Sequence, residues 1–188
     1  GFHHAPTDAE RLRGLLLFRS TAGDGFTTLD EYAARMPAGQ AAIYTLAGDD
    51  DKLLRHAPQL EGFAARGIEV LLLTDPIDEI VVSQLGAHAD HPFRSAAEAD
   101  IDLSAVRPRA GADAEAAAAA SAGADGTAAG DPAGAAPGDA ADIGPLCDRL
   151  AALLGDAVAA VRPSDRLTTS AACLVVPAGS PSDHLVRL

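Results

Sequence analysis

Residues 67–76 read GIEVLLLTDP. Five of the six side chains that follow Gly67 are apolar, and turn residues stand at both ends of the run. A short apolar run of this kind is typical of a strand that is buried on both faces of a sheet. We therefore expect a strand over 68–73. Because proline fits the first turn of a helix, we also expect a helix over 76–85.

A second apolar run lies upstream, over residues 41–46. The segment between the two runs carries apolar residues at helical spacing, and Pro58 divides it into two short helices. Two buried strands joined by a crossover of about 20 residues form a right-handed βαβ unit with parallel strands. We therefore expect residues 1–109 to be of the α/β class and to contain a small αβα subdomain.

Two capping boxes predict further helices in this block. Thr7 with Glu10, and Thr28 with Glu31, each place a hydroxyl three residues before a carboxylate. Such a pair satisfies the free N–H groups at the start of a helix. The expected helices cover residues 8–18 and 28–36, with a glycine loop at 23–25 and a short edge segment at 91–94.

A low-complexity stretch divides the chain. Residues 110–142 are almost wholly Ala, Gly and Asp with two prolines. They lack the apolar area that would offset the entropy of ordering them, so we expect a linker. The block before the linker, 1–109, and the block after it, 143–188, are then separate. With only about 45 residues, the second block is expected to be the truncated beginning of an α+β domain.

The block after the linker opens with the clearest amphipathic pattern in the chain. Apolar residues recur at helical spacing over 143–154, and Gly155 provides a stop signal. This predicts a helix. Two apolar stretches at 157–161 and 172–176 are expected to be strands.

The charge of the chain limits its partners. The formal net charge is −13, from 27 acidic and 14 basic side chains. Such a field repels phosphate backbones and anionic lipid, so we expect neither nucleic acid nor a membrane surface as a partner. No apolar run reaches the roughly 18 residues of a membrane span, and no signal-peptide pattern is present. Cys147 and Cys173 show no metal-type spacing, so we expect free thiols and a cytoplasmic location.

Three carboxylates follow the strand over 68–73. Asp75 stands where α/β proteins place ligand-binding carboxylates, and Asp78 and Glu79 lie within one helical turn of it. One interpretation is a Mg²⁺ site that acts on a phosphorylated substrate. The other is that Asp75 caps the next helix while the two acids interact favourably with the helix dipole. The residues leave both interpretations open.

The helix over 76–85 has more apolar residues than one buried stripe needs. Ile77, Ile80, Val81 and Leu85 occupy more than one side of it. Either both faces of the helix are covered, or an apolar patch is exposed for a partner.

The ordered motifs of the chain resemble one family. They are LLFRST at 16–21, TLDEY at 28–32, RMP at 35–37, AIY at 42–44, PQLE at 58–61, GIEVL at 67–71 and LTDPIDE at 73–79. Together they are similar to the later part of the middle domain of the ninety-kilodalton heat-shock chaperones, above all the bacterial, high-temperature protein G type. The opening of that family's C-terminal domain resembles LLGD at 153–156, VR at 161–162, RLT at 166–168 and HLVRL at 184–188.

The resemblance implies a role in protein folding. Members of the family are dimeric, ATP-driven molecular chaperones that bind partly folded clients in a clamp. The resemblance places this chain outside the nucleotide-binding domain, outside the part that supplies the ATPase arginine, and before the dimerisation helices. It therefore implies no enzyme activity and no cofactor for this chain, with ATP and Mg²⁺ bound elsewhere in the parent. The parent is expected to be a homodimer and this chain a monomer.

The resemblance also implies candidate site residues. In bacterial members, the helix after the TDPIDE motif contributes to the client-contact surface, which corresponds here to Glu79, Ile80 and Ser83. Relatives often carry an aromatic residue in place of Ile80 and an amide in place of Ser83. The helix is therefore expected either to contact unfolded or partly folded clients or to act only as a structural relay. The alternative from another class is a small α/β enzyme that uses Asp75 with Mg²⁺.

Overall fold

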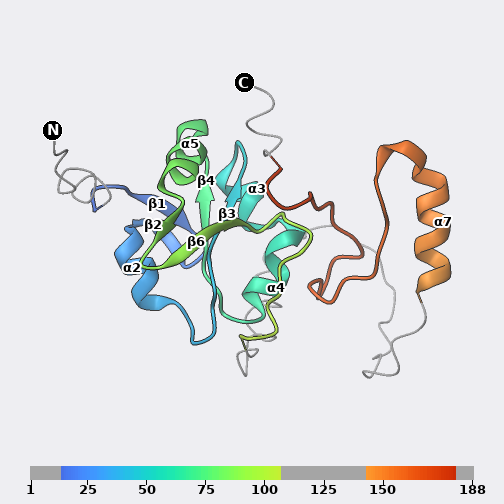
Figure 1. Cartoon of the computed structure of the whole chain (residues 1–188), viewed down its shortest axis with the longest axis horizontal. Helices are drawn as coiled ribbons and strands as arrows, with labels where there is room; N and C mark the ends of the chain where they lie inside the picture. The colour runs from blue at the N-terminus through green and yellow to red at the C-terminus, as the bar shows by residue number, and fades with distance from the viewer. Residues whose placement is uncertain (1–13, 107–142, 181–188) are drawn as a thin grey trace, which may run out of the picture. The chain divides into compact units, whose positions relative to one another are not determined.

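Figure 1 shows the computed structural model, which describes residues 14–106 and 143–180. The chain divides into two compact units, residues 1–117 with 166–188 and residues 118–165. The first unit contains the sheet and the second contains helix α7, and each is described by itself. The predicted linker, 110–142, lies outside the described residues, so the three-part division of the chain stays a prediction.

A six-stranded mixed sheet forms the centre of the first unit, in the order β2-β1-β4-β3-β6-β5. Its central strands, β3 (Ile43–Ala47) and β4 (Val70–Leu73), are parallel, with Thr45 opposite Leu71. This pairing confirms the predicted βαβ unit. The outer strands are β1 (Phe18–Ser20), β2 (Gly23–Thr27), β5 (Ala87–His88) and β6 (His91–Ser95).

Side chains of the central strands alternate between two buried clusters. Val70 and Leu72 belong to one cluster, and Leu71 and Leu73 belong to the other. Helices cover both faces of the sheet, which explains the continuous apolar run of β4 and confirms the predicted αβα subdomain. The first cluster includes residues of α3 (Asp51–Arg55), η1 (Pro58–Leu60) and α4 (Glu61–Ala64), and the second includes residues of α2 (Leu29–Arg35) and α5 (Pro76–Leu85).

Local signals set the helix boundaries as predicted. The Thr28 hydroxyl accepts a hydrogen bond from the Glu31 N–H, and the Glu31 carboxylate accepts one from the Thr28 N–H at 2.9 Å. This capping box starts α2. Pro58 begins η1, which separates α3 from α4. The two short helices expected around this proline are therefore confirmed.

The amino-terminal region differs from the sequence prediction. Most of the predicted helix over 8–18 lies outside the described residues, but residues 14–17 form a turn and an irregular stretch, and Phe18 begins β1. The loop predicted at 23–25 is wrong, because these residues lie in β2. Most of β2 is exposed at the sheet edge, so its sequence carries no apolar strand signal. The predicted edge segment at 91–94 is β6, which lies between β3 and the two-residue edge strand β5.

The carboxyl-terminal region is less regular than expected. Helix α7 (Gly144–Leu154) confirms the predicted amphipathic helix, and it ends at a glycine as predicted. The strands predicted over 157–161 and 172–176 are wrong, since Val176 makes only an isolated parallel bridge to Glu98. A strand needs a neighbouring strand to pair with its backbone. Within the described residues, these two stretches lack one.

Arg166 joins the segment after residue 165 to the rest of the first unit, of which this segment is a part. Arg166 is 9% exposed, and its guanidinium donates to the carbonyls of Glu98 at 2.7 Å and Ala96 at 2.6 Å. The same guanidinium lies over the Phe63 ring. These contacts offset the cost of burying a cation. A Cβ atom at Gly62 would lie 2.9 Å from the Arg166 carbonyl oxygen, so this close approach requires a glycine.

A second contact joins the same segment to α4. The Glu61 carboxylate accepts hydrogen bonds from the backbone N–H groups of Thr168, Thr169 and Ser170 at 2.6, 2.9 and 3.0 Å, and from their hydroxyls. Burial acts to raise the pKa of Glu61, but these hydrogen bonds outweigh it and lower the pKa to about 2. The fold therefore stabilises the charged form of this carboxylate.

Glu61→Gln is expected to lower the free energy of unfolding at neutral pH by about 1 kcal/mol, because charge-assisted hydrogen bonds are lost at a partly solvated site. The ordinary pKa of glutamate is 4.5, and that of Glu61 in the fold is about 2. The stabilisation is therefore complete above the ordinary pKa and is lost as the pH falls towards 2. Urea unfolding of both chains over this pH range measures the difference. A difference that stays constant with pH would contradict the role of the charge.

Candidate functional site

Helix α5 presents apolar side chains to solvent. Val82 is buried in the core cluster on its side of the sheet, whereas Ile77 and Ile80 are 54% and 40% exposed. The helix thus has one covered side and one open apolar side. The sequence left open whether both faces of this helix are covered or whether an apolar patch is exposed. At Ile77 and Ile80 the structure shows an exposed patch.

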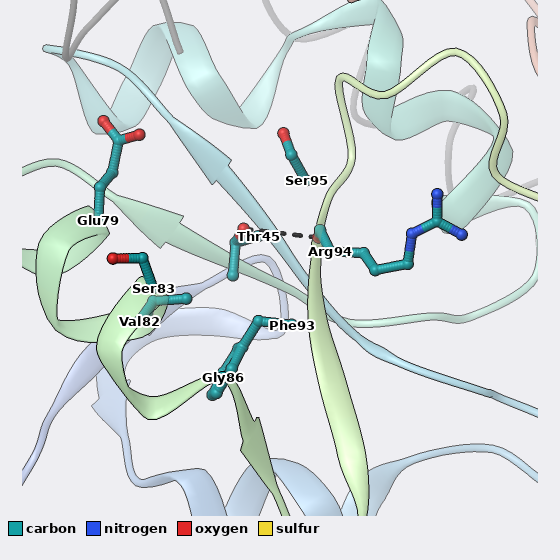
Figure 2. Close-up of a pocket in the computed structure, with 8 residues that line it drawn as sticks. All are labelled: Thr45, Glu79, Val82, Ser83, Gly86, Phe93, Arg94 and Ser95. Carbon is teal, nitrogen blue, oxygen red and sulfur yellow. Dashed lines mark hydrogen bonds between the residues drawn. The ribbon is translucent and has the colours of Figure 1, made fainter. Parts of the chain in front are cut away.

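The structure brings two of the three predicted client-contact residues together. Glu79 and Ser83 lie one helical turn apart on the wall of a shallow pocket of about 230 Å³ (Figure 2). Ile80 lies outside the lining of this pocket, with its side chain exposed and its carbonyl accepting a hydrogen bond from the Ser83 hydroxyl at 2.8 Å. The other lining residues are Thr45, Val82, Gly86, Phe93, Arg94 and Ser95.

Strands β3 and β6 form the opposite wall of this pocket. The Thr45 hydroxyl donates to the Arg94 carbonyl at 3.5 Å (Figure 2). The Arg94 guanidinium points away from α5 and donates through Nε to the Glu98 carboxylate at 2.9 Å. The apolar side chains of Val82 and Phe93 complete the lining. The pocket therefore offers a mixed surface of hydroxyl and apolar groups, with its one arginine engaged by a carboxylate.

A larger pocket of about 360 Å³ adjoins the first and shares Thr45, Glu79 and Ser95 with it. It lies at the carboxyl end of β3. Sequence reasoning missed this pocket, although the two parallel strands contained a signal for it, because the carboxyl ends of such strands form ligand crevices. The further lining residues are Leu46, Ala47, Gly48, Asp49, Leu54, Ala57, Gln59, Ala97, Leu174, Val176 and Ser180.

Asp75 acts as a helix cap. Its Oδ1 accepts a hydrogen bond from the Ile77 N–H at 3.1 Å at the start of α5. Burial, and then the neighbouring charge of Asp75, raise the pKa of Asp78, which makes Asp78 a poorer ligand for a cation. Among the described residues, no group of three histidine, cysteine or acidic side chains could hold a metal ion. The geometry therefore favours the cap over the Mg²⁺ site.

Cys147 and Cys173 are free thiols, as predicted. Within residues 14–106 and 143–180, each helix is too short or too polar to cross a membrane.

Comparison with known proteins identifies the family. The family model described as Hsp90 protein matches residues 1–188. The chain belongs to the Hsp90 family. It is 48% identical over 174 residues to the chaperone protein HtpG of Paramagnetospirillum magneticum, covering 93% of this chain and 25% of that protein. It is 41% identical over 179 residues to the chaperone protein HtpG of Rhodospirillum rubrum, covering 95% of this chain and 26% of that protein.

One solved structure is similar to part of this chain. The middle domain of a heat shock protein from Plasmodium falciparum matches with 29% sequence identity and a TM-score of 0.46, covering 50% of this chain and 40% of that one. The resemblance to the bacterial branch of the chaperone family, drawn from the sequence motifs, is confirmed by the relatives. The Hsp90-family chain spans about a quarter of the length of these relatives.

Asp75→Ala is expected to lower the free energy of unfolding by about 1 kcal/mol, whereas Asp75→Asn should be nearly neutral, because asparagine caps a helix as well as aspartate does. Urea denaturation of the two variants measures this contrast. A Mg²⁺ site would behave differently, since added Mg²⁺ would stabilise the unmodified chain. A Mg²⁺-dependent rise of the unfolding midpoint that disappears in Asp75→Asn would contradict the cap.

Proposed function

We propose that this Hsp90-family chain serves as a client-contact surface and structural relay of an ATP-driven molecular chaperone, without an ATP site of its own. Family membership and the chaperone names of the relatives support the general role. The observation that carries the specific role is the open apolar side of α5. There Ile77 and Ile80 are exposed beside Glu79 and Ser83, which line the pocket. An exposed apolar patch with a polar rim is typical of a protein interaction site.

The energetics of this surface favour weak, adaptable contact. Burial of about 200 Å² of apolar area yields on the order of 5 kcal/mol, at about 25 cal/mol per Å², before the costs of ordering a flexible partner. Only part of this free energy remains as affinity. Such contact suits clients that share apolar character rather than one sequence. Several such surfaces in one clamp would then reach useful affinity through raised effective concentration.

The relay role is supported by how the segment after residue 165 is held. Arg166 is buried among backbone carbonyls beside Phe63, and Glu61 binds the backbone of residues 168–170. The core beneath these contacts is close-packed and therefore transmits displacement with little compression. A movement of this segment would thus reach the sheet and α5. In the parent protein, this unit would pass movement between the nucleotide and dimerisation domains.

The remaining parts of this proposal concern the parent protein. We expect the parent to bind ATP with Mg²⁺, to form a homodimer in the cytoplasm, and to take unfolded or partly folded proteins as clients. We expect this chain by itself to be a monomer that contacts clients but neither nucleic acid nor a membrane. The strongly negative charge of the chain supports the last expectation.

The geometry supports the alternative enzyme less well. A Mg²⁺-dependent reaction on a phosphorylated substrate would need Asp75 as a ligand, but this carboxylate accepts the capping hydrogen bond of α5.

Ile80→Asp is expected to weaken binding of a permanently unfolded model protein to this chain by about threefold to tenfold, because a charge replaces exposed apolar area. Fluorescence anisotropy with the labelled model protein measures the affinity. Leu53→Asp is the matched control. Leu53 is 74% exposed on α3, which packs on the other face of the sheet, so this variant should bind as the unmodified chain does.

Two outcomes would contradict α5 as the client-contact surface. One is unchanged affinity of Ile80→Asp for the unfolded protein, and the other is an equal loss of affinity in Leu53→Asp. Circular dichroism of both variants, compared with the unmodified chain, shows whether the fold is retained.

A further inference from the structure

The first unit includes a segment of irregular backbone, residues 166–176, which we call the clasp segment. It contacts two short stretches of the same unit. These are residues 59–63, in η1 and α4, and residues 96–99, which follow β6. Arg166 contacts both stretches, and Val176 contacts the second one through backbone hydrogen bonds. The clasp segment is therefore attached near both of its ends.

The attachments of the clasp segment are mainly polar. Arg166 is the one buried side chain in this segment, all of which the structure describes, and Leu174 is 66% exposed. The Leu174 carbonyl accepts a hydrogen bond from the Gln59 side chain at 2.9 Å. The Val176 N–H donates to the Ala97 carbonyl, also at 2.9 Å. Regions with few buried apolar contacts open at a lower free energy than a core does, so we expect the clasp segment to open more easily than the sheet.

The core of the sheet is complete without the clasp segment. Both buried clusters consist of residues between Leu16 and Val106, and strands β1 to β6 lie in the same range. Departure of the clasp segment would remove hydrogen bonds and a cation from the unit, but no member of either cluster. The sheet can therefore stay folded while the segment leaves.

Arg166 makes the docking of this segment all-or-none. Its guanidinium donates to the carbonyls of Ala96 and Glu98 at 2.6 and 2.7 Å, and its Cζ atom lies 5.4 Å from the centroid of the Phe63 ring. A buried cation that lost only some of these partners would be costly, whereas water solvates the cation once the segment has left. Partly docked positions are therefore disfavoured.

The contact with Glu61 supports the same conclusion. Three N–H groups that are adjacent in the chain, at residues 168–170, donate to this one carboxylate. Because they share one acceptor, they lose it together when the segment moves away. The carboxylate and the N–H groups then bind water instead. Each polar group of this contact thus has a partner in the docked state and in the undocked state.

We propose that the clasp segment docks and undocks as one unit while the sheet stays folded, with Arg166 as its anchor. This inference rests on the relay role in the proposed function, because it names the contact that connects and disconnects the relay. When the segment is docked, its movement reaches the sheet through Arg166 and Glu61. When it is undocked, this connection is absent. The fold therefore contains a two-state connection rather than a permanently rigid one.

Amide hydrogen exchange, resolved by NMR, tests independent undocking in the unmodified chain. The reporters are the N–H groups of Thr168, Ser170 and Val176, each a donor in the docked segment. We expect them to exchange at least about tenfold faster than the amides of β4, but more slowly than amides of an unfolded chain. Their exchange should also depend less on urea than that of the β4 amides, because undocking exposes little surface.

Arg166→Met tests whether the segment moves as one unit. This variant removes the guanidinium and keeps an unbranched side chain. We expect all three reporters to exchange about tenfold faster, including Val176 at the far end of the segment, because hydrogen bonds from a charged group contribute strongly. The β4 amides should keep their rates, which also shows that the sheet is retained. Arg166→Lys keeps the charge but loses the planar fork, so it should accelerate the same amides by a smaller factor.

Arg55→Met is the matched control. Arg55 also donates to a backbone carbonyl, that of Gly23 at 2.9 Å, and it forms an ion pair with Asp51. These partners lie outside the clasp segment. The control loses the same kind of side chain as Arg166→Met and should leave the three reporters at their original rates.

Several results would overturn the proposal. Reporters that exchange no faster than the β4 amides would mean that the segment opens only when the whole unit unfolds. Reporters that exchange as in an unfolded chain would mean that the segment is not docked. In Arg166→Met, acceleration confined to Thr168, or shared equally by β4, would contradict a separate unit. Equal acceleration of the reporters in Arg55→Met would contradict Arg166 as the anchor.

Failure of this proposal is distinguishable from failure of the proposed function, because no client is present in the exchange measurements. If the reporters open only with the whole unit while Ile80→Asp weakens binding of the unfolded protein, the clasp fails and the α5 surface stands. If Ile80→Asp leaves that binding unchanged while the reporters open separately from β4, the α5 surface fails and the clasp stands.

Discussion

Parallel pairing of β3 with β4, in a sheet covered on both faces, is the constraint on which the rest of the structure depends. Every side chain of β4 is almost fully buried, alternating between the two clusters. Parallel strands need a crossover connection rather than a tight turn, and double-sided burial needs helices on both faces. The connections after β3 and β4 therefore diverge. The divergence that completes the core also leaves the pocket of about 360 Å³ at the carboxyl end of β3, so this pocket is a consequence of the fold.

Buried polar contacts then fix how the layers meet. The Tyr32 hydroxyl of α2 donates to the Glu69 carbonyl at 2.7 Å and accepts hydrogen bonds from the Gln40 side chain at 3.0 Å and the Tyr44 N–H at 3.2 Å. Burial raises the pKa of Tyr32 to about 12, so the hydroxyl keeps its proton and remains a donor. This one group joins α2 to β3 and to Glu69, the residue that precedes β4. Apolar packing alone would allow the helix to slide along the sheet.

Local and periodic patterns in the sequence predicted individual helices and strands. Contacts between segments that are distant in sequence could not be predicted from such patterns. The apolar runs gave β3 and β4, and the capping box of Thr28 gave α2. Strand β2 was missed because an exposed edge strand needs few apolar residues. The Glu61 contact joins residues 107 positions apart, and nothing in the local sequence marks it. Glu79, Ile80 and Ser83 came only from family resemblance. The pocket at the carboxyl end of β3 could not be predicted, because it brings together residues as distant in sequence as Leu46 and Val176.

Helix α5 meets two demands with one sequence, and its acidic residues reconcile them. Val82 must be apolar for the core, whereas Ile77 and Ile80 are apolar without core burial. Exposed isoleucines favour self-association, a liability that charge of one sign counteracts by repulsion between copies. Asp78 and Glu79 supply such charge on the same helix, and the chain as a whole is strongly acidic. The negative charge of this helix and of the whole chain thus counteracts the self-association that the exposed isoleucines favour.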